Sequence, residues 1–286
     1  MGKYKVGKSL SFDGDFSAEL EKMKEAGFES VDFDLCKFWP NRAKEIENYK
    51  NMEDGLEAIA RSGLFFNGVH VSFGNEWDVS TLDEDFRRVV IERIKEIFSR
   101  IDPYKPYCYI LHGSFEPIKD EEREARLSQL IKSLSELKEY TKSFVCVEVL
   151  PRTCLCNTSL ETAYVADKSG VGVCMDVNHL LQEKTEHAIR DLGDRIKTTH
   201  ISDYDHINER HWMPGEGDID WQEVLKALGE CGYNGVWNYE LGLTAPNTIE
   251  RERDFTYHDF INNADELFNG KPVTVIGKRK DNLGMW

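Results

Sequence analysis

The chain of 286 residues is long enough for one large α/β barrel, which typically needs ~250 residues, or for two ordinary domains. Its content of 40% hydrophobic and 31% charged residues is typical of a soluble globular protein with a substantial core. The net charge of −16 argues against a nucleic-acid partner, because an acidic surface repels a phosphate backbone.

The sequence also argues against a membrane or secreted protein. No stretch approaches the ~18 consecutive apolar residues of a membrane span, and residues 1–10 lack the apolar core of a signal peptide. The seven cysteines are scattered and form no CxxC pair. We therefore expect reduced thiols, a cytoplasmic location and no membrane association.

Apolar runs typical of strands alternate with amphipathic runs typical of helices along the whole chain. The predicted strands are 4–9, 30–35, 64–73, 107–111, a segment around Val147, 171–175, 197–202 and 235–239. The predicted helices are 16–26, 52–62, 85–100, 122–142, 160–168, 186–192, 221–231 and 256–268. Gly27 and Gly232 stand where two of these helices should end in a left-handed turn.

Eight strands alternating with eight helices predict a closed parallel (β/α)8 TIM barrel. No linker or low-complexity segment divides the chain, so we expect one domain over residues 1–286. Within it, residues 271–286 form a polar tail that we expect to wrap the barrel or a neighbouring subunit.

Side chains able to bind a metal stand at the ends of the predicted strands. Glu148, Asp176, His200 and Glu240 each follow an apolar run, at separations of about one strand–helix unit. In a parallel barrel the carboxyl ends of all strands meet on one rim. Two glutamates, an aspartate and a histidine there predict a site for a divalent metal ion such as Mn²⁺, Mg²⁺, Co²⁺ or Zn²⁺.

Other polar and aromatic residues near the same rim are candidates to bind a substrate. His179 follows Asp176 by three residues, and Glu209 and His211 come just before the rigid turn at 214–217. Trp77 and Trp212 could stack on a ring. The substrate-binding candidates are His70, His112, Arg152, His179, Glu209, His211 and Trp39.

Several motifs resemble the sugar phosphate isomerase/epimerase family, whose members are xylose-isomerase-like barrels. The motifs are EVLPR at 148–152, NTSLETA at 157–163, MDVNH at 175–179, HISD at 200–203, PGEGDIDW at 214–221 and YEL at 239–241. The resemblance covers essentially the whole chain and is most specific between residues 145 and 241. Relatives include ketose 3-epimerases, hydroxypyruvate isomerases and inosose dehydratases.

The resemblance implies a metal-dependent isomerase or epimerase acting on a small-molecule carbohydrate. Its family pattern has Glu148, Asp176, His200 and Glu240 binding one divalent ion, while the two glutamates move a proton through a metal-bound enediolate. His179 corresponds to a histidine that contacts substrate oxygens, and Arg152 would orient hydroxyls. The identity of the sugar and the formation of a homo-oligomer are left open.

The chain departs from the ketose 3-epimerase pattern in the loop after His200. His211 stands where those enzymes carry arginine, and the loop is longer. The triplet 209–211, together with His70 and His112, is similar to endonuclease-IV-type apurinic nucleases, which use three zinc ions. A multinuclear zinc phosphodiesterase is therefore the main alternative. An inosose-type dehydratase and a catalytically silent sugar-binding barrel are the others.

Overall fold

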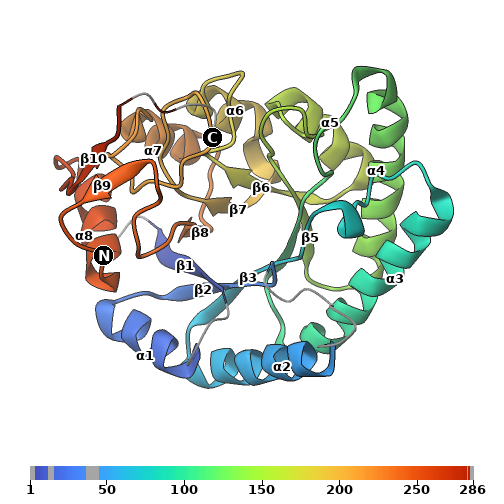
Figure 1. The fold of residues 1–286 in the computed structure, drawn as a ribbon, viewed down its shortest axis with the longest axis horizontal. Coiled ribbons are helices and arrows are strands. Elements are labelled where there is room, and N and C mark those ends of the chain that lie inside the picture. The colour runs from blue at the N-terminus through green and yellow to red at the C-terminus, as the bar shows by residue number, and fades with distance from the viewer. Residues whose placement is uncertain (1–3, 12–15, 37–44, 282, 284–286) are drawn as a thin grey trace.

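The computed structural model describes residues 4–11, 16–36, 45–281 and 283. Eight parallel strands form a nearly closed barrel, and helices surround it (Figure 1). The strands are β1 Lys5–Ser11, β2 Ser30–Asp34, β3 Phe65–His70, β4 Cys108–Leu111, β5 Phe144–Glu148, β6 Gly172–Asp176, β7 Ile196–His200 and β8 Val236–Tyr239. The helices are α1 Phe16–Ala26, α2 Glu45–Ser62, α3 Glu84–Ile101, α4 Asp120–Tyr140, α5 Ser159–Ser169, α6 Thr185–Leu192, α7 Trp221–Glu230 and α8 Tyr257–Phe268.

The strands pair in chain order from β1 to β7, and β1 also pairs with β8. Between β7 and β8 the link is short: a parallel bridge joins Ile201 to Tyr239, and the Ile201 amide donates to the carbonyl of Asn238 at 2.8 Å. The predicted fold class is thus confirmed. The predicted (β/α)8 alternation matches element by element, because period-two and helical patterns are both strong in this chain.

Some predicted boundaries were wrong. Helix α2 begins at Glu45 rather than at residue 52, and β3 ends at His70 rather than at 73. Gly27 and Gly232 have φ values of 108° and 69°, as a left-handed helix end requires. Asp220 accepts a hydrogen bond from the amide of Glu223 and so caps the beginning of α7.

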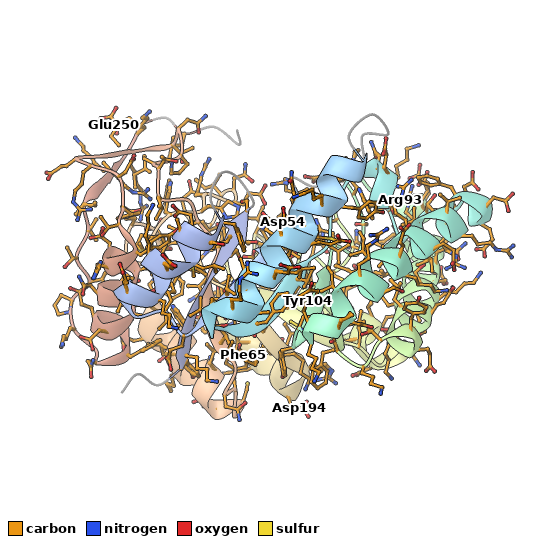
Figure 2. The ribbon with its side chains drawn as sticks, turned by 90° about the horizontal axis from the view of Figure 1, so that it is seen from below. Asp54, Phe65, Arg93, Tyr104, Asp194 and Glu250 are labelled. Carbon is orange, nitrogen blue, oxygen red and sulfur yellow. The ribbon has the colours of Figure 1, made fainter. Side chains whose placement is uncertain are left out.

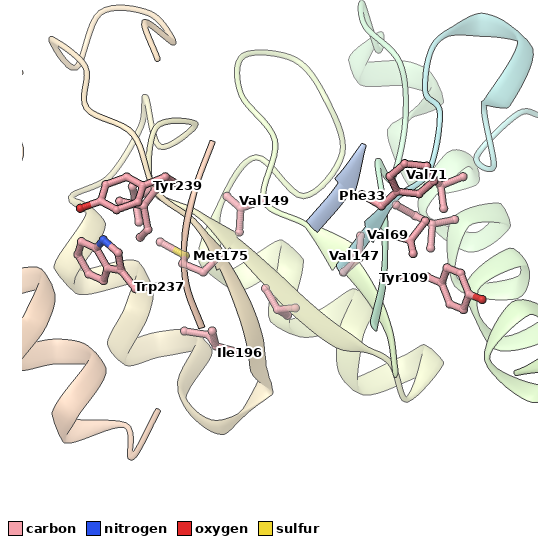
Figure 3. Close-up of a cluster of buried hydrophobic side chains, with 14 of the residues drawn as sticks. Phe33, Val69, Val71, Tyr109, Val147, Val149, Met175, Ile196, Trp237 and Tyr239 are labelled. Carbon is pink, nitrogen blue, oxygen red and sulfur yellow. The ribbon is translucent and has the colours of Figure 1, made fainter. Parts of the chain in front are cut away.

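Apolar side chains fill two separate regions. The larger one lies between the strands and the helices, and Figure 3 shows part of it, including Tyr109, Met175 and Trp237. The smaller one consists of Cys108, Ile110, Cys146 and Cys174. Residues two positions apart on a strand point to the same face. Glu148 follows Cys146 by two residues and Asp176 follows Cys174 by two, so these side chains share the barrel interior.

An antiparallel two-stranded sheet formed by β9 (Ile249–Arg251) and β10 (Gly277–Arg279), with α8 between them in the chain, adds to the barrel. Three-residue strands carry too little periodicity to be predicted. Figure 2 shows Glu250 of β9 at one end of the molecule and Phe65 and Asp194 at the other. Arg279 donates to the Glu216 carbonyl and to both carboxylate oxygens of Asp218, so this part of the tail lies on the loop that follows β7. In the described part of the chain, no helix is both long and apolar enough to cross a membrane.

Candidate functional site

The residues predicted at the strand ends lie together on the carboxyl rim of the barrel. His70, Glu148, Asp176 and His200 are the last residues of β3, β5, β6 and β7. His112 and Glu240 lie just beyond β4 and β8. A cavity of about 330 Å³ opens here. It is lined by Asp34, Cys36, His70, Phe73, His112, Ser114, Phe115, Glu116, Glu148, Leu150, Pro151, Arg152, Cys154, His179, Glu209, His211 and Glu240.

Glu148 is the centre of the site, and its side chain is only 1% exposed. Its Oε2 lies 3.2 Å from Nε2 of His70 and 3.1 Å from Nε2 of His112. Its Oε1 lies 2.9 Å from Nδ1 of His200. The two early histidines therefore hold one oxygen of this carboxylate, and His200 holds the other.

Nδ1 of His200 is the point on which three carboxylates converge. Besides Glu148, it lies 3.2 Å from Oε2 of Glu240 and 3.8 Å from Oδ2 of Asp176. Possible ligand atoms of His70, Glu148, His200 and Glu240 lie within 4.8 Å of one another, as do those of Glu148, Asp176 and His179.

The predicted metal ligands fit a divalent cation. Oδ2 of Asp176 is buried and has no hydrogen-bond partner among the described residues. Three buried or half-buried carboxylates facing one another repel, and such a group is stable only with compensating positive charge. Carboxylate and imidazole ligands suit Mn²⁺, Co²⁺ and Zn²⁺, and the carboxylates also suit Mg²⁺.

The site keeps its two glutamates ionised. Burial raises the pKa of Glu240, but the facing His200 more than offsets this and holds the pKa below its usual range. Burial also raises the pKa of Glu148, and His200 with His112 lowers it well below its usual range. For Asp176 burial dominates and raises the pKa well above its usual value. A bound cation would therefore favour the ionised form of the Asp176 carboxylate.

A second group of side chains borders the first. Nε2 of His179 lies 3.1 Å from Oε2 of Glu209, and Nδ1 of His179 lies 2.9 Å from the Val149 carbonyl. His211 places its Nδ1 3.0 Å from the carbonyl of Glu240. Possible ligand atoms of His179, Glu209 and His211 lie within 4.8 Å of one another. The loop after β7 thus contributes to the cavity, as its sequence suggested.

Charge pairing links His179 and Glu209 tightly. Burial lowers the pKa of His179, but Asp176 and Glu209 raise it to about 10. Burial raises the pKa of Glu209, while His179 and Arg152 together lower it to about 2. Both groups are therefore charged near neutral pH.

Arg152 lines the cavity, but its guanidinium is already engaged. Nε donates to Oε1 of Glu116 at 2.7 Å, and Nη1 lies 2.8 Å from Oδ1 of Asn208 and 3.1 Å from Oε1 of Glu209. The sequence did not indicate Glu116, which belongs to a loop after β4. Its partner lies 36 residues away, and no local pattern joins the two.

The sequence also missed two residues at the carboxyl end of β2. Asp34 and Cys36 line the cavity, and Sγ of Cys36 lies 3.4 Å from Nδ1 of His70. The carboxylate of Asp34 at a strand end was a signal that could have revealed this position. Trp77 and Trp212 are almost fully buried, at 4% and 0% exposed, and pack in the interior rather than presenting a face to a ring. Trp39 lies outside the described residues.

A family model described as a xylose isomerase-like TIM barrel matches residues 20–257. The chain belongs to this family. The match covers the strand ends from His70 to Glu240 and confirms the family that the motifs indicated.

Curated members of the family with similar sequences include sugar epimerases. The chain is 25% identical over 280 residues to D-psicose 3-epimerase from Ruminiclostridium cellulolyticum, covering 89% of this chain and 87% of that protein. It is 23% identical over 251 residues to ketose 3-epimerase from Arthrobacter globiformis, covering 81% of each.

Solved structures share the barrel. D-psicose 3-epimerase with D-tagatose from Clostridium cellulolyticum H10 superposes with a TM-score of 0.69 at 20% identity, over 85% of this chain and 87% of that chain. A D-tagatose 3-epimerase-like protein gives a TM-score of 0.72 at 20% identity, over 93% and 98%. At these identities the superpositions show the fold.

Proposed function

We propose that this protein is a divalent-metal-dependent epimerase or isomerase of a ketose. The observation that carries the proposal is the convergence of Glu148, Glu240 and Asp176 on Nδ1 of His200 at the barrel rim. The similarity to ketose 3-epimerases along most of the chain supports it.

In this proposal Glu148, Asp176, His200 and Glu240 hold the cation. When bound, such an ion polarises the sugar carbonyl and so acidifies the neighbouring C–H group. The remaining work falls to side chains of this chain. One glutamate takes the proton from that carbon and later releases it to solvent; the other first takes up a proton from solvent and then gives it to the opposite face, or to the neighbouring carbon for an isomerisation, so that both glutamates are ionised again after each turnover.

The environment of both glutamates suits proton transfer. Each is ionised before substrate binds, because His200 lowers its pKa. Each also lines a cavity of about 330 Å³, to which the loop after β7 contributes Glu209 and His211. His179, His211 and the Arg152–Glu116 pair lie where they can orient hydroxyl groups.

The charges around the cavity favour a substrate without phosphate. Among the described lining residues, the carboxylates of Asp34, Glu116, Glu148, Glu209 and Glu240 face two cationic side chains, the guanidinium of Arg152 and the imidazole of His179, which is paired with Glu209. That guanidinium is bound to Glu116 and Glu209. A phosphate dianion would meet these carboxylates with no further arginine or lysine among the described lining residues to compensate them, which costs binding energy.

The test combines metal content with a substrate panel. Protein purified without added metal is subjected to elemental analysis and then assayed with Mn²⁺ or Co²⁺ on free ketoses and on their phosphates. We expect one bound cation per chain and epimerisation or isomerisation of a free ketose, with exchange of one carbon-bound proton for solvent deuterium. No metal binding, or no turnover of any ketose, would contradict the proposal.

A second candidate rests on the ligand group formed by His179, Glu209 and His211. Together with His70 and His112 beside Glu148, it offers ligands for more than one ion. Two or three equivalents of zinc per chain, with cleavage of a duplex containing an abasic site, would favour a phosphodiesterase. The acidic cavity and the epimerase relatives favour the first candidate. Loss of water from an inosose in the same panel would indicate a dehydratase.

A further inference from the structure

Asp34, Cys36 and His70 form a group of possible metal ligands at the edge of the cavity, beside the proposed catalytic site. Their ligand atoms all lie within 4.8 Å of one another, and all three side chains line the cavity. None of the three is among the four proposed ligands of the catalytic cation. The proposed function gives Asp34 and Cys36 no role.

The backbone brings the three residues together. Asp34 and His70 are paired residues at the ends of the neighbouring strands β2 and β3. The chain turns after β2, where the Cys36 amide donates to Oδ1 of Asp34 at 2.7 Å. Oγ of Ser72, just after β3, donates to the Leu35 carbonyl at 2.8 Å and holds this turn against the end of β3. Strand pairing and hydrogen bonds to the main chain therefore fix the arrangement.

The distance between sulfur and nitrogen in this group suits a shared metal ion. Sγ of Cys36 lies 3.4 Å from Nδ1 of His70. Zinc binds thiolate at ~2.3 Å and imidazole at ~2.0–2.1 Å with tetrahedral geometry, which places the two ligand atoms about 3.6 Å apart. In the metal-free protein the same distance allows a weak S–H···N hydrogen bond. An ion can therefore replace the thiol proton with little movement of either side chain.

The other nitrogen of His70 favours a metal on Nδ1. Nε2 lies 3.2 Å from Oε2 of Glu148, and an ionised carboxylate can only accept, so Nε2 carries a proton and donates it. In the neutral ring, Nδ1 then has a free lone pair. Nδ1 also lies 3.0 Å from the Val71 carbonyl, and a proton or a cation on Nδ1 makes that contact favourable. A metal-bound histidine commonly donates its second N–H to a carboxylate, as this ring does.

The three ligand types select a class of ion. Thiolate together with imidazole favours zinc and similar thiophilic ions, whereas Mg²⁺ and Mn²⁺ prefer oxygen. The four proposed ligands of the catalytic site include no sulfur, so the two sites differ in the ion they prefer. Burial raises the pKa of Cys36 to about 12, so the thiol keeps its proton until a cation offsets the cost of the thiolate.

We propose that Asp34, Cys36 and His70 form a second metal site, which binds a thiophilic divalent ion of the zinc class at the edge of the cavity. Binding forms a bond from the ion to Sγ and releases the thiol proton to solvent, and water from the cavity completes the coordination. With three protein ligands rather than four, the site should fill when the ion is added rather than retain it through purification. Binding here does not depend on the proposed function.

The test uses Cd²⁺ as the probe, because cadmium bound to a thiolate has an ultraviolet charge-transfer absorption that oxygen and nitrogen ligands do not give. Metal-free wild type is titrated with Cd²⁺ and, separately, with Mn²⁺, and binding is followed by absorption and by calorimetry. We expect the absorption to saturate at one sulfur-bound Cd²⁺ per chain and Mn²⁺ to give none. Cys36→Ser should abolish the absorption. Asp34→Asn should weaken this binding by at least the ~10-fold that loss of an outer partner of a metal ligand causes.

Cys154→Ser is the matched control, since Cys154 also lines the cavity but is not part of the ligand group. We expect this variant to keep the absorption in full. Thermal unfolding of the metal-free variants shows whether each is folded. If Cys36→Ser does not fold, the affinity of Asp34→Asn decides.

The outcomes distinguish this inference from the proposed function. No sulfur absorption when Cd²⁺ is added to wild type would overturn the second site. Absorption that persists in Cys36→Ser, or that Cys154→Ser abolishes, would assign the sulfur ligand to another cysteine and overturn it as well, as would unchanged affinity in Asp34→Asn. A chain that binds Cd²⁺ through Cys36 but turns over no ketose would support the second site and contradict the proposed function alone.

Discussion

The β9–β10 sheet contacts the loop after β7 through a buried ion pair between Arg251 and Glu216, which a substitution can remove. Arg251 donates from Nε to Oε1 of Glu216 at 3.0 Å and from Nη2 to Oε2 at 2.8 Å. Both side chains are 1% exposed. Glu216 lies in the turn at 214–217, five residues after His211. The ion pair therefore links the β9–β10 sheet to the loop that lines the cavity.

Arg251→Met removes the cation and leaves the Glu216 carboxylate buried. Breaking one partner of a buried pair typically costs ~3–5 kcal/mol. Unfolding entropy of ~2.1 cal/mol/K per residue amounts to ~0.6 kcal/mol/K for 286 residues. The unfolding temperature should therefore fall by ~5–8 °C.

Two controls give the experiment its meaning. In the double variant Arg251→Met with Glu216→Gln, no charge stays buried, so we expect it to recover at least half of the lost stability. In Arg253→Met the lost partner is Asp259, and Arg253 is 51% exposed. That variant should cost less than ~1 kcal/mol, as for other surface pairs.

Differential scanning calorimetry of the four proteins supplies the comparison. The reasoning is refuted if Arg251→Met shifts the unfolding temperature by less than ~2 °C, which corresponds to little more than ~1 kcal/mol. It is also refuted if the double variant is as unstable as the single one. A rise in KM for Arg251→Met with kcat retained would show that the β9–β10 sheet also positions the loop that lines the cavity.

Two more predictions concern the rim. Glu240→Gln should lower kcat by at least ~10²-fold in a protein that still folds, because a carboxamide cannot accept the proton. Exposed Glu250→Gln is the matched control, and substantial remaining turnover would assign the proton transfer elsewhere. Mn²⁺ at ~100 times its Kd should stabilise the protein by ~2.7 kcal/mol at pH 8 and clearly less at pH 5. Burial lowers the pKa of His200, but Cys174 and the facing Glu240 and Glu148 raise it well above its usual value. The cation must therefore displace a proton from His200, and this becomes harder as the proton concentration rises at lower pH. Equal thermal shifts at the two pH values would contradict this competition.

Much of the site could be predicted because strand periodicity fixes where a side chain points. Glu148, Asp176 and His200 end three strands whose alternation is clear in the sequence, and parallel strands in a barrel share one carboxyl rim. The barrel, the rim and the six strand-end residues therefore follow from local patterns. The family motifs added the expected roles of these residues, which experiments have still to test.

Contacts between distant segments could not be predicted. The pairing of Arg152 with Glu116, the β9–β10 sheet held on Glu216, and the hydrogen bond from Asn67 to Thr198 across the barrel each join residues that share no local pattern. They depend on the stagger of the strands, on one register shift between β2 and β3, and on the path of the rim loops. The sequence by itself determined which residues reach the rim; only the closed barrel decided which of them meet, because distances across a barrel are set by its closure and not by spacing along the chain.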